Sequence, residues 1–165
     1  MQPEQGPVPR VRRARGEEDA RIAGALLDRF NREYETPTPG PEFLAARLGE
    51  LDGDDFATFI ARDGELDAGV AVLRFRPALW SATPEGYIAE LYVIGEHRRR
   101  GLGAELMEAM LTMARERGCE WLELGTDEHD HDAHRLYERF GFSNFTDPEA
   151  PEGERERMLI YEREP

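Results

Sequence analysis

The stretch Gly86–Gly103, GYIAELYVIGEHRRRGLG, decides the fold. Its first part, Gly86–Ile94, is apolar on both faces of an extended strand except at Glu90, which predicts a central strand covered on both sides. Apolar residues at helical spacing follow the glycine-rich turn and predict a helix to about Arg117. Gly118 is placed to end that helix as a C-cap glycine. A buried strand that leads directly into an amphipathic helix is therefore the expected centre of the fold.

Strands and helices also alternate on either side of this centre. Periodicity and turn residues predict this order: strand 8–15, helix 18–34, helix from Pro41, hairpin strands 56–61 and 68–75, strand 86–94, helix to 117, strand 120–126, helix 130–140 and strand 158–161. The central strand–helix–strand unit requires a parallel crossover, whereas the hairpin is antiparallel. We therefore predict a single α/β (α+β) domain over residues 8–165, after a disordered lead at residues 1–7. Its sheet is mixed, mostly antiparallel, with about six to seven strands and helices on both faces.

The charge of the chain bears on its partners. Asp and Glu number 35 against 21 basic residues, all of them arginine, for a net charge of −14. This balance repels nucleic acid and would attract cationic partners such as amines. The alternative, which net charge alone favours, is an acidic surface that only keeps the protein in solution. No apolar run approaches the roughly 20 residues of a membrane helix, and the start MQPEQGPVPR lacks the apolar core of a secretory signal. We expect a cytoplasmic protein with neither nucleic-acid nor membrane partners.

The segment Arg98–Ala104, RRRGLGA, has the features of an anion site. The first N–H groups of a helix have no partners inside the helix, and the helix dipole adds positive charge there. Glycines let a ligand approach the backbone, and arginines supply further donors. Together these features favour a phosphate or pyrophosphate. A Walker loop requires a lysine that the chain lacks, and a Rossmann fingerprint requires a glycine where Leu106 stands, so neither motif fits.

The spacing Arg98-x-x-Gly101-x-Gly103 resembles the pyrophosphate loop of the GNAT acetyltransferase superfamily, Arg/Gln-x-x-Gly-x-Gly/Ala. The segment Ala133–Phe142, AHRLYERFGF, resembles the second coenzyme A element of that family. The resemblance extends over residues 86–145 by motif and over residues 8–85 by element order. It implies a GNAT-like fold in which the central strands splay apart to admit acyl-CoA.

The resemblance also implies roles for particular residues. The backbone of Leu91 and Val93 would hold the pantetheine of acetyl-CoA, the co-substrate. Pyrophosphate binding would fall to the amides and side chains of Arg98, Arg99, Gly101, Leu102 and Gly103. Asp130 stands where the family often has asparagine, and a carboxylate cannot donate the hydrogen bond of an amide, so its contact with CoA is open.

Two residues are candidates for proton transfer. The family places a tyrosine at the position of Tyr137 as the general acid that protonates the leaving thiolate; the alternative is a core contact with Phe140 and Phe142. Glu90 interrupts Ile88, Tyr92 and Ile94 on one strand face, where partial burial would raise its pKa and suit it as a base. Several family members use a glutamate on this strand in that way. The alternative for Glu90 is a structural carboxylate paired with an arginine.

The resemblance implies an enzyme. The expected activity is acetyl-CoA-dependent N-acetyl transfer to a primary amine by direct attack in a ternary complex, and the alternative is a non-catalytic acyl-CoA-binding sensor. His131 and His134 are spaced for joint metal ligation, but no third ligand cluster accompanies them and Cys119 is a lone cysteine, so we expect no metal. A homodimer is expected because the family commonly dimerises. The acids Glu33, Glu35 and Glu42 suggest a cationic acceptor, whose identity the sequence leaves open.

Overall fold

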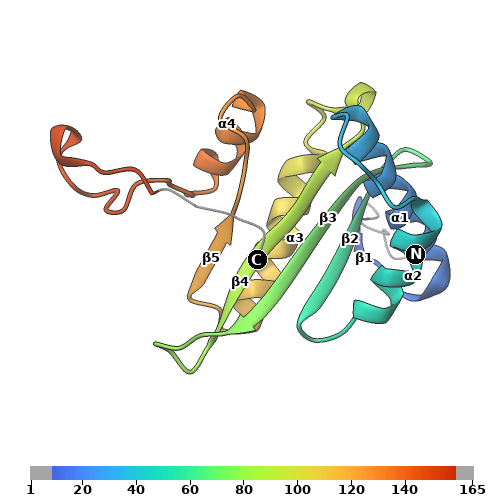
Figure 1. The fold of residues 1–165 in the computed structure, drawn as a ribbon, viewed down its shortest axis with the longest axis horizontal. Coiled ribbons are helices and arrows are strands. Elements are labelled where there is room, and N and C mark those ends of the chain that lie inside the picture. The colour runs from blue at the N-terminus through green and yellow to red at the C-terminus, as the bar shows by residue number, and fades with distance from the viewer. Residues whose placement is uncertain (1–8, 159–165) are drawn as a thin grey trace, which may run out of the picture. The chain divides into compact units, whose positions relative to one another are not determined.

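The computed structural model describes residues 9–158 and contains the predicted alternation of strands and helices (Figure 1). The elements are β1 (Val11–Arg13), α1 (Gly16–Glu33), α2 (Pro41–Leu51), β2 (Phe56–Asp63), β3 (Leu66–Pro77), β4 (Pro84–Val93), the 3-10 turn η1 (Gly95–His97), α3 (Leu102–Glu116), β5 (Trp121–Leu124), α4 (His131–Arg139) and the 3-10 turn η2 (Glu152–Glu154). The described chain forms two compact units, residues 9–125 and 126–158. Within the described residues, no helix is both long and apolar enough to span a membrane.

The sheet is mixed, as predicted, and its strands follow the order of the sequence from β1 to β5. Neighbours from β1 to β4 pair antiparallel, and β4 pairs parallel with β5. The expected six to seven strands exceed the five that the described residues form, because after α4 this part of the chain makes only an isolated bridge between Phe145 and Arg157. Apart from Met158, the expected last strand lies outside the described residues, and so does the predicted lead at residues 1–7.

Helices cover both faces of the sheet (Figure 1). On one face, Phe30 of α1 stacks on Tyr92 of β4, with ring centroids 4.9 Å apart. On the other, α3 approaches so closely that a Cβ on Gly69 would lie 3.1 Å from the side chain of Leu106. The larger side chains that are fully buried come from the sheet and α3: Ile60, Leu73, Leu102, Leu106, Met107, Met110 and Val70. The pyrophosphate-loop candidate therefore starts a helix that is anchored in the core.

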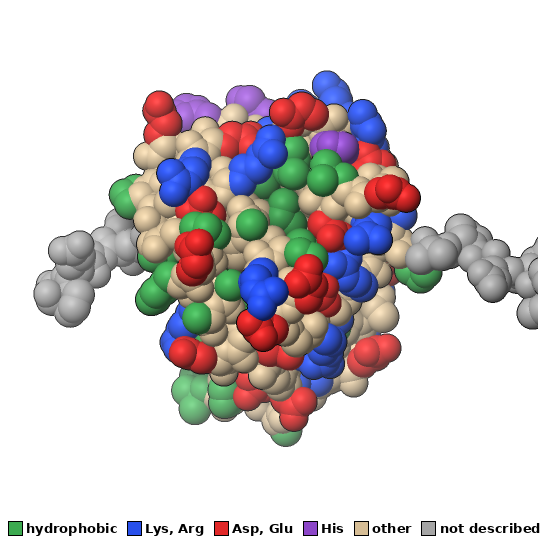
Figure 2. Space-filling model, turned by 90° about the vertical axis from the view of Figure 1, so that its right-hand side faces the viewer, with side chains coloured by type: hydrophobic (Ala, Val, Ile, Leu, Met, Phe, Trp, Pro, Cys, Tyr) green, Lys and Arg blue, Asp and Glu red, His purple; other side chains and the backbone are tan. Residues whose placement is uncertain are grey.

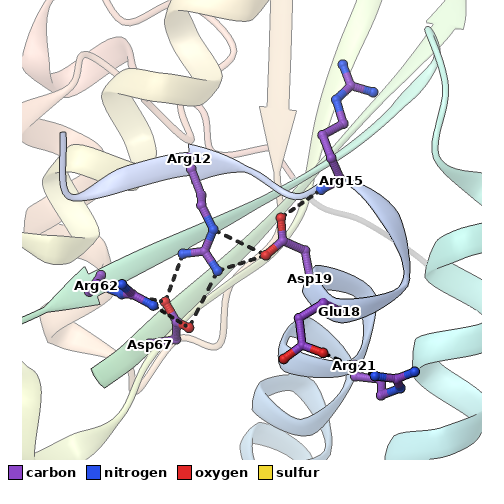
Figure 3. Close-up of polar contacts among 7 residues, drawn as sticks. All are labelled: Arg12, Arg15, Glu18, Asp19, Arg21, Arg62 and Asp67. Carbon is purple, nitrogen blue, oxygen red and sulfur yellow. Dashed lines mark hydrogen bonds and ion pairs between the residues drawn. The ribbon is translucent and has the colours of Figure 1, made fainter. Parts of the chain in front are cut away.

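A cluster of ion pairs fastens the short strand β1 to its neighbours (Figure 3). The guanidinium of Arg12 donates hydrogen bonds to Asp19 of α1 and Asp67 of β3, each 2.8 Å long. Arg62 also donates to Asp67, at 3.2 Å. The N–H of Arg15 donates to Asp19 at 2.9 Å, which stabilises the start of α1. Four elements, β1, α1, β2 and β3, are thereby joined through two carboxylates.

Replacing Asp67 with asparagine should destabilise the fold at neutral pH. Burial by itself raises the pKa of Asp67, but hydrogen bonds from Arg12 and Arg62 outweigh it and hold that pKa below its ordinary value. A carboxylate of this kind contributes stability above its unfolded pKa of about 4, and the contribution is lost as pH falls through the lower folded pKa. We expect Asp67→Asn to lower the free energy of unfolding by about 1–3 kcal/mol at neutral pH, and by less in acid.

Urea unfolding at neutral and acidic pH measures both effects. Glu65→Gln is the control, because Glu65 is exposed in the adjoining hairpin turn. If the two variants unfold alike at both pH values, the ion-pair cluster does not contribute to stability.

Candidate active site

A β-bulge in β4 sets the direction of the candidate base. Val72 of β3 pairs with Glu90 and the next residue, Leu73, pairs with Ile88, so Ala89 is an extra residue on β4. Directly paired residues share a face of a sheet, and consecutive residues of β3 point to opposite faces. Glu90 and Ile88 therefore lie on opposite faces. The prediction that they share one face was wrong, because simple alternation does not hold across a bulge.

The strands β4 and β5 part at the same place. Their parallel pairing runs from Glu85 opposite Trp121 to Ile88 opposite Leu124, where it ends. From Glu90 to Val93, β4 continues its ladder with β3 but has no partner strand on its other side within the described residues. This unpaired edge can accept an extended ligand as a further strand would be accepted. Leu91 and Val93, the expected pantetheine contacts, lie on it.

The carboxylate of Glu90 has no hydrogen-bond or ion-pair partner among residues 9–158. The residue is half-buried, on the face of the sheet that α1 covers. Burial raises its pKa above the ordinary value. The alternative, in which Glu90 is a structural carboxylate paired with an arginine, is therefore not found in residues 9–158. An unpaired, partly buried carboxylate beside an open strand edge is suited to accept a proton near neutral pH.

The loop between β4 and α3 leaves backbone donors without partners at the start of the helix. Arg99 has a φ of 62° and Gly101 a φ of 86°, both in the left-handed region. The first helical bond of α3 runs from the N–H of Glu105 to the carbonyl of Gly101, at 3.0 Å. In the described part of the chain, the N–H groups from Gly101 to Ala104 have no protein acceptor. Successive free amides at a helix N-terminus form a concave anion site. Since its side chain is buried, Leu102 offers only its amide.

Arg98 does not direct its guanidinium freely toward a ligand. It donates to the carboxylate of Glu33 at 2.5 Å and to the carbonyl of Val93 at 2.8 Å. Glu33 also accepts from the Tyr92 hydroxyl at 2.6 Å; burial and this hydrogen bond raise the pKa of Tyr92 to about 12. Burial by itself raises the pKa of Glu33, but its two donors outweigh it, so the residue stays ionised. Glu33 thus neutralises Arg98 and is not the exposed acid expected to face a cationic acceptor.

The other two arginines of the loop differ from each other. Arg100 donates to Asp63 at 2.7 Å, and the same carboxylate lies 2.7 Å from Nδ1 of His97. His97 and Arg100 therefore serve to fasten the loop to the end of β2. Arg99 has no hydrogen bond or ion pair within the described residues. Of the three, it is the cation left available to a bound anion.

The second unit contains the remaining candidates. The side chain of Asp130 caps α4 by accepting from the N–H of Ala133 at 3.0 Å, so its carboxylate has a structural task. Tyr137 is half-buried on α4 and meets Phe142 edge-on, with ring centroids 6.3 Å apart. That contact fits the core alternative and leaves the acid role as a prediction. The His131 and His134 rings lie 5.9 Å apart, and no group of three or more His, Cys, Asp or Glu residues suited to a metal occurs in residues 9–158.

Sequence reasoning missed two features of the site. Asp63 was not expected to hold the pyrophosphate loop, and Arg74 of β3 was not singled out. Arg74 interrupts the apolar run from Leu73 to Phe75, a signal that could have drawn attention to it.

In this structure, β4 separates from its parallel neighbour β5 at Ile88 and leads to a loop whose free amides can bind an anion. This is the architecture of a coenzyme A-binding acyltransferase. The family model described as "Acetyltransferase (GNAT) family" matches residues 23–142. The chain belongs to the GNAT acetyltransferase family.

Individual relatives agree with this assignment. A crystal structure of a proposed acetyltransferase from Arthrobacter sp. FB24 is 40% identical, with a TM-score of 0.82, and the match covers 98% of this chain and 99% of that one. The aminoalkylphosphonate N-acetyltransferase of Salmonella typhimurium is 30% identical over 136 residues, 82% of this chain and 86% of that protein. The mycothiol acetyltransferase of Thermobispora bispora is 43% identical over 125 residues, 73% of this chain. This match spans only 36% of that relative. A separate match, to an N-alpha-acetyltransferase 30 from Schizosaccharomyces pombe, spans 58% of that protein.

Proposed function

We propose that this protein is an acetyl-CoA-dependent N-acetyltransferase that moves an acetyl group to a primary amine. The observation that carries the proposal is the open edge of β4 beyond Ile88, where pairing with β5 ends, on the strand that leads to the free amides at the start of α3. Membership of the GNAT family and the N-acetyltransferase names of its relatives support it. Cytoplasmic location and a homodimer are part of the same proposal.

The chain has the groups that acetyl-CoA requires. The amides of Gly101, Leu102 and Gly103, with the guanidinium of Arg99, would bind the pyrophosphate. The open edge of β4 at Leu91 and Val93 would hold the pantetheine. Arg98 would act mainly by keeping the end of α1 against β4 through Glu33. When bound, acetyl-CoA supplies a thioester whose carbonyl carbon an amine can attack.

Proton movement is assigned to two side chains. Glu90 would take the proton that the amine loses as its nitrogen bonds to the acetyl carbon. Tyr137 would give its phenolic proton to the sulfur as the carbon–sulfur bond breaks. Attack is direct, since the Cys119 thiol donates to the Trp121 carbonyl at 2.9 Å and has no activating base among its described contacts.

Glu90→Gln should lower kcat/KM by about 100-fold without destabilising the protein. A base works in its ionised form, so the wild-type rate should rise as pH increases through the raised pKa of Glu90. The glutamine variant should lack this acidic limb. Because burial disfavours the charged carboxylate, the neutral amide should leave the melting temperature unchanged or slightly higher.

Thiol release from acetyl-CoA, followed against pH, and thermal unfolding measure the two effects. Glu50→Gln, a change on the exposed surface of α2, is the matched control. If the Glu90 and Glu50 variants have the same pH profile, Glu90 is not the base.

The reaction itself is tested by thiol release with a panel of amines. The panel should include aminoalkylphosphonates, peptides with free N-termini and aminoglycosides, together with simple alkylamines. Release with any of them supports the proposal. Saturable CoA binding without release from the whole panel would instead indicate an acyl-CoA-binding sensor.

A further inference from the structure

Two arginine side chains in the first unit have no partner among the described residues. Figure 2 shows acidic and arginine side chains interleaved over one face of the molecule. In residues 9–125, every arginine side chain except those of Arg74 and Arg99 makes a hydrogen bond or an ion pair with another described residue. Acids outnumber arginines by 35 to 21 in the chain, so an arginine without a carboxylate partner is unexpected. Arg99 lies in the pyrophosphate loop, whereas Arg74 lies on β3.

Arg74 borders a hollow in the sheet. The hollow has a volume of about 230 Å³ and is lined by Arg74, Phe75, Arg76, Tyr87 and Glu123. Arg76, the other cation there, is neutralised by Glu85 and Glu123, each at 2.9 Å. The exposed guanidinium of Arg74 is therefore the positive charge in this hollow that has no partner among the described residues.

The hollow opens on the same face of the sheet as Glu90. Val72 pairs with Glu90, and Arg74, two residues further along β3, pairs with Tyr87. Residues two apart on a strand point to the same face, about 7 Å from each other. The bulge at Ala89 adds Tyr87 to this face, because without it Tyr87 and Glu90 would point to opposite faces. The free guanidinium of Arg74 and the unpaired carboxylate of Glu90 therefore belong to neighbouring positions on the same face of the sheet.

We infer that the acceptor carries an oxyanion, such as a carboxylate or phosphonate, joined to its primary amine by a short spacer. Arg74 binds the oxyanion, and the amine lies at Glu90. A guanidinium recognises such groups through paired N–H donors, and the Tyr87 hydroxyl can donate a further hydrogen bond. A cationic group in the same place would be repelled by Arg74. This inference rests on the proposed function and narrows its substrate class.

The test compares ω-amino acids, from glycine to 5-aminopentanoate, with their carboxamides in the thiol-release assay. Each pair differs in the negative charge, so the wild type should prefer the acid of the best-fitting length. Arg74→Gln should raise KM for that acid by at least about tenfold, with kcat and the rates for the carboxamides little changed. Arg74→Lys should recover part of the loss. Arg115→Gln, on the exposed surface of α3, should change nothing.

The outcomes separate this inference from the proposed function. If Arg74→Gln affects acids and carboxamides equally, the inference is wrong while N-acetyl transfer stands. If the wild type binds CoA but releases no thiol, the proposed function fails, and calorimetry with the ω-amino acids in the presence of CoA decides the inference. Binding that Arg74→Gln abolishes would support an oxyanion site, whereas no binding, or equal binding by both proteins, would overturn it.

Discussion

Gly101→Val is expected to abolish measurable CoA binding, whereas Gly101→Asn should retain most of it. Gly101 precedes α3 with a φ of 86°, in the left-handed region. A Cβ in that region costs about 1–2 kcal/mol, and branching at Cβ adds to the strain, whereas asparagine enters the region more readily. Valine should therefore leave this conformation and displace the amides of Leu102 and Gly103. We expect at least about a 100-fold loss of affinity, equivalent to about 2.7 kcal/mol.

The comparison of valine with asparagine separates backbone conformation from bulk. A Cβ at Gly101 would lie 3.4 Å from Nη2 of Arg10, a contact that a flexible side chain can relieve. Calorimetry with CoA measures affinity, and thermal unfolding shows whether each variant is folded. Gly49→Ala, in α2 where nothing lies within 4 Å of the added atom, is the control. Folded Gly101→Val that binds CoA within threefold of wild type would show that the left-handed turn is not required.

The elements that sequence reasoning placed well are those with local causes. Helix α1 follows the apolar spacing of Ile22, Leu26 and Phe30, and α2 begins at Pro41 after a proline-rich break. Gly118, with a φ of 68°, follows α3 as predicted. Periodicity, caps and turn residues act over a few positions, so they can be recognised from neighbouring residues alone. The order of elements and the mixed sheet follow from them.

The features that were not predicted depend on contacts between distant segments. The bulge at Ala89 exists only in the pairing of β4 with β3, and nothing in the sequence of β4 alone marks where it falls. The partners of Arg98 and Arg100 lie on α1 and at the end of β2. With 35 acids in the chain, nothing local indicates which carboxylate each arginine meets, or that Arg74 meets none. The roles of individual charges in the site therefore required the fold.

Tyr137→Phe should lower kcat by about 100-fold while leaving CoA affinity nearly unchanged. The change removes one hydroxyl and keeps the ring that meets Phe142 edge-on, so α4 should remain folded. If Tyr137 protonates the departing thiolate, its loss acts on the chemical step alone. The variant should also lose the alkaline limb of the pH profile, because an acid fails once it is deprotonated. A role limited to the core contact would predict a different result, with little change in either kcat or melting temperature, because phenylalanine keeps the ring.

Single-turnover thiol release isolates the chemical step from product release. The matched control is Tyr34→Phe, which removes the hydroxyl of an exposed tyrosine at the end of α1. Equal single-turnover rates in the two variants would remove Tyr137 as the acid. The informative combination is a lower single-turnover rate and no alkaline limb in Tyr137→Phe alone, while Glu90→Gln lacks the acidic limb. That combination would assign the two limbs of the pH profile to two different side chains. Since Glu90 would accept a proton as the amine attacks and Tyr137 would donate one as the thiolate leaves, a variant lacking both should lose both limbs.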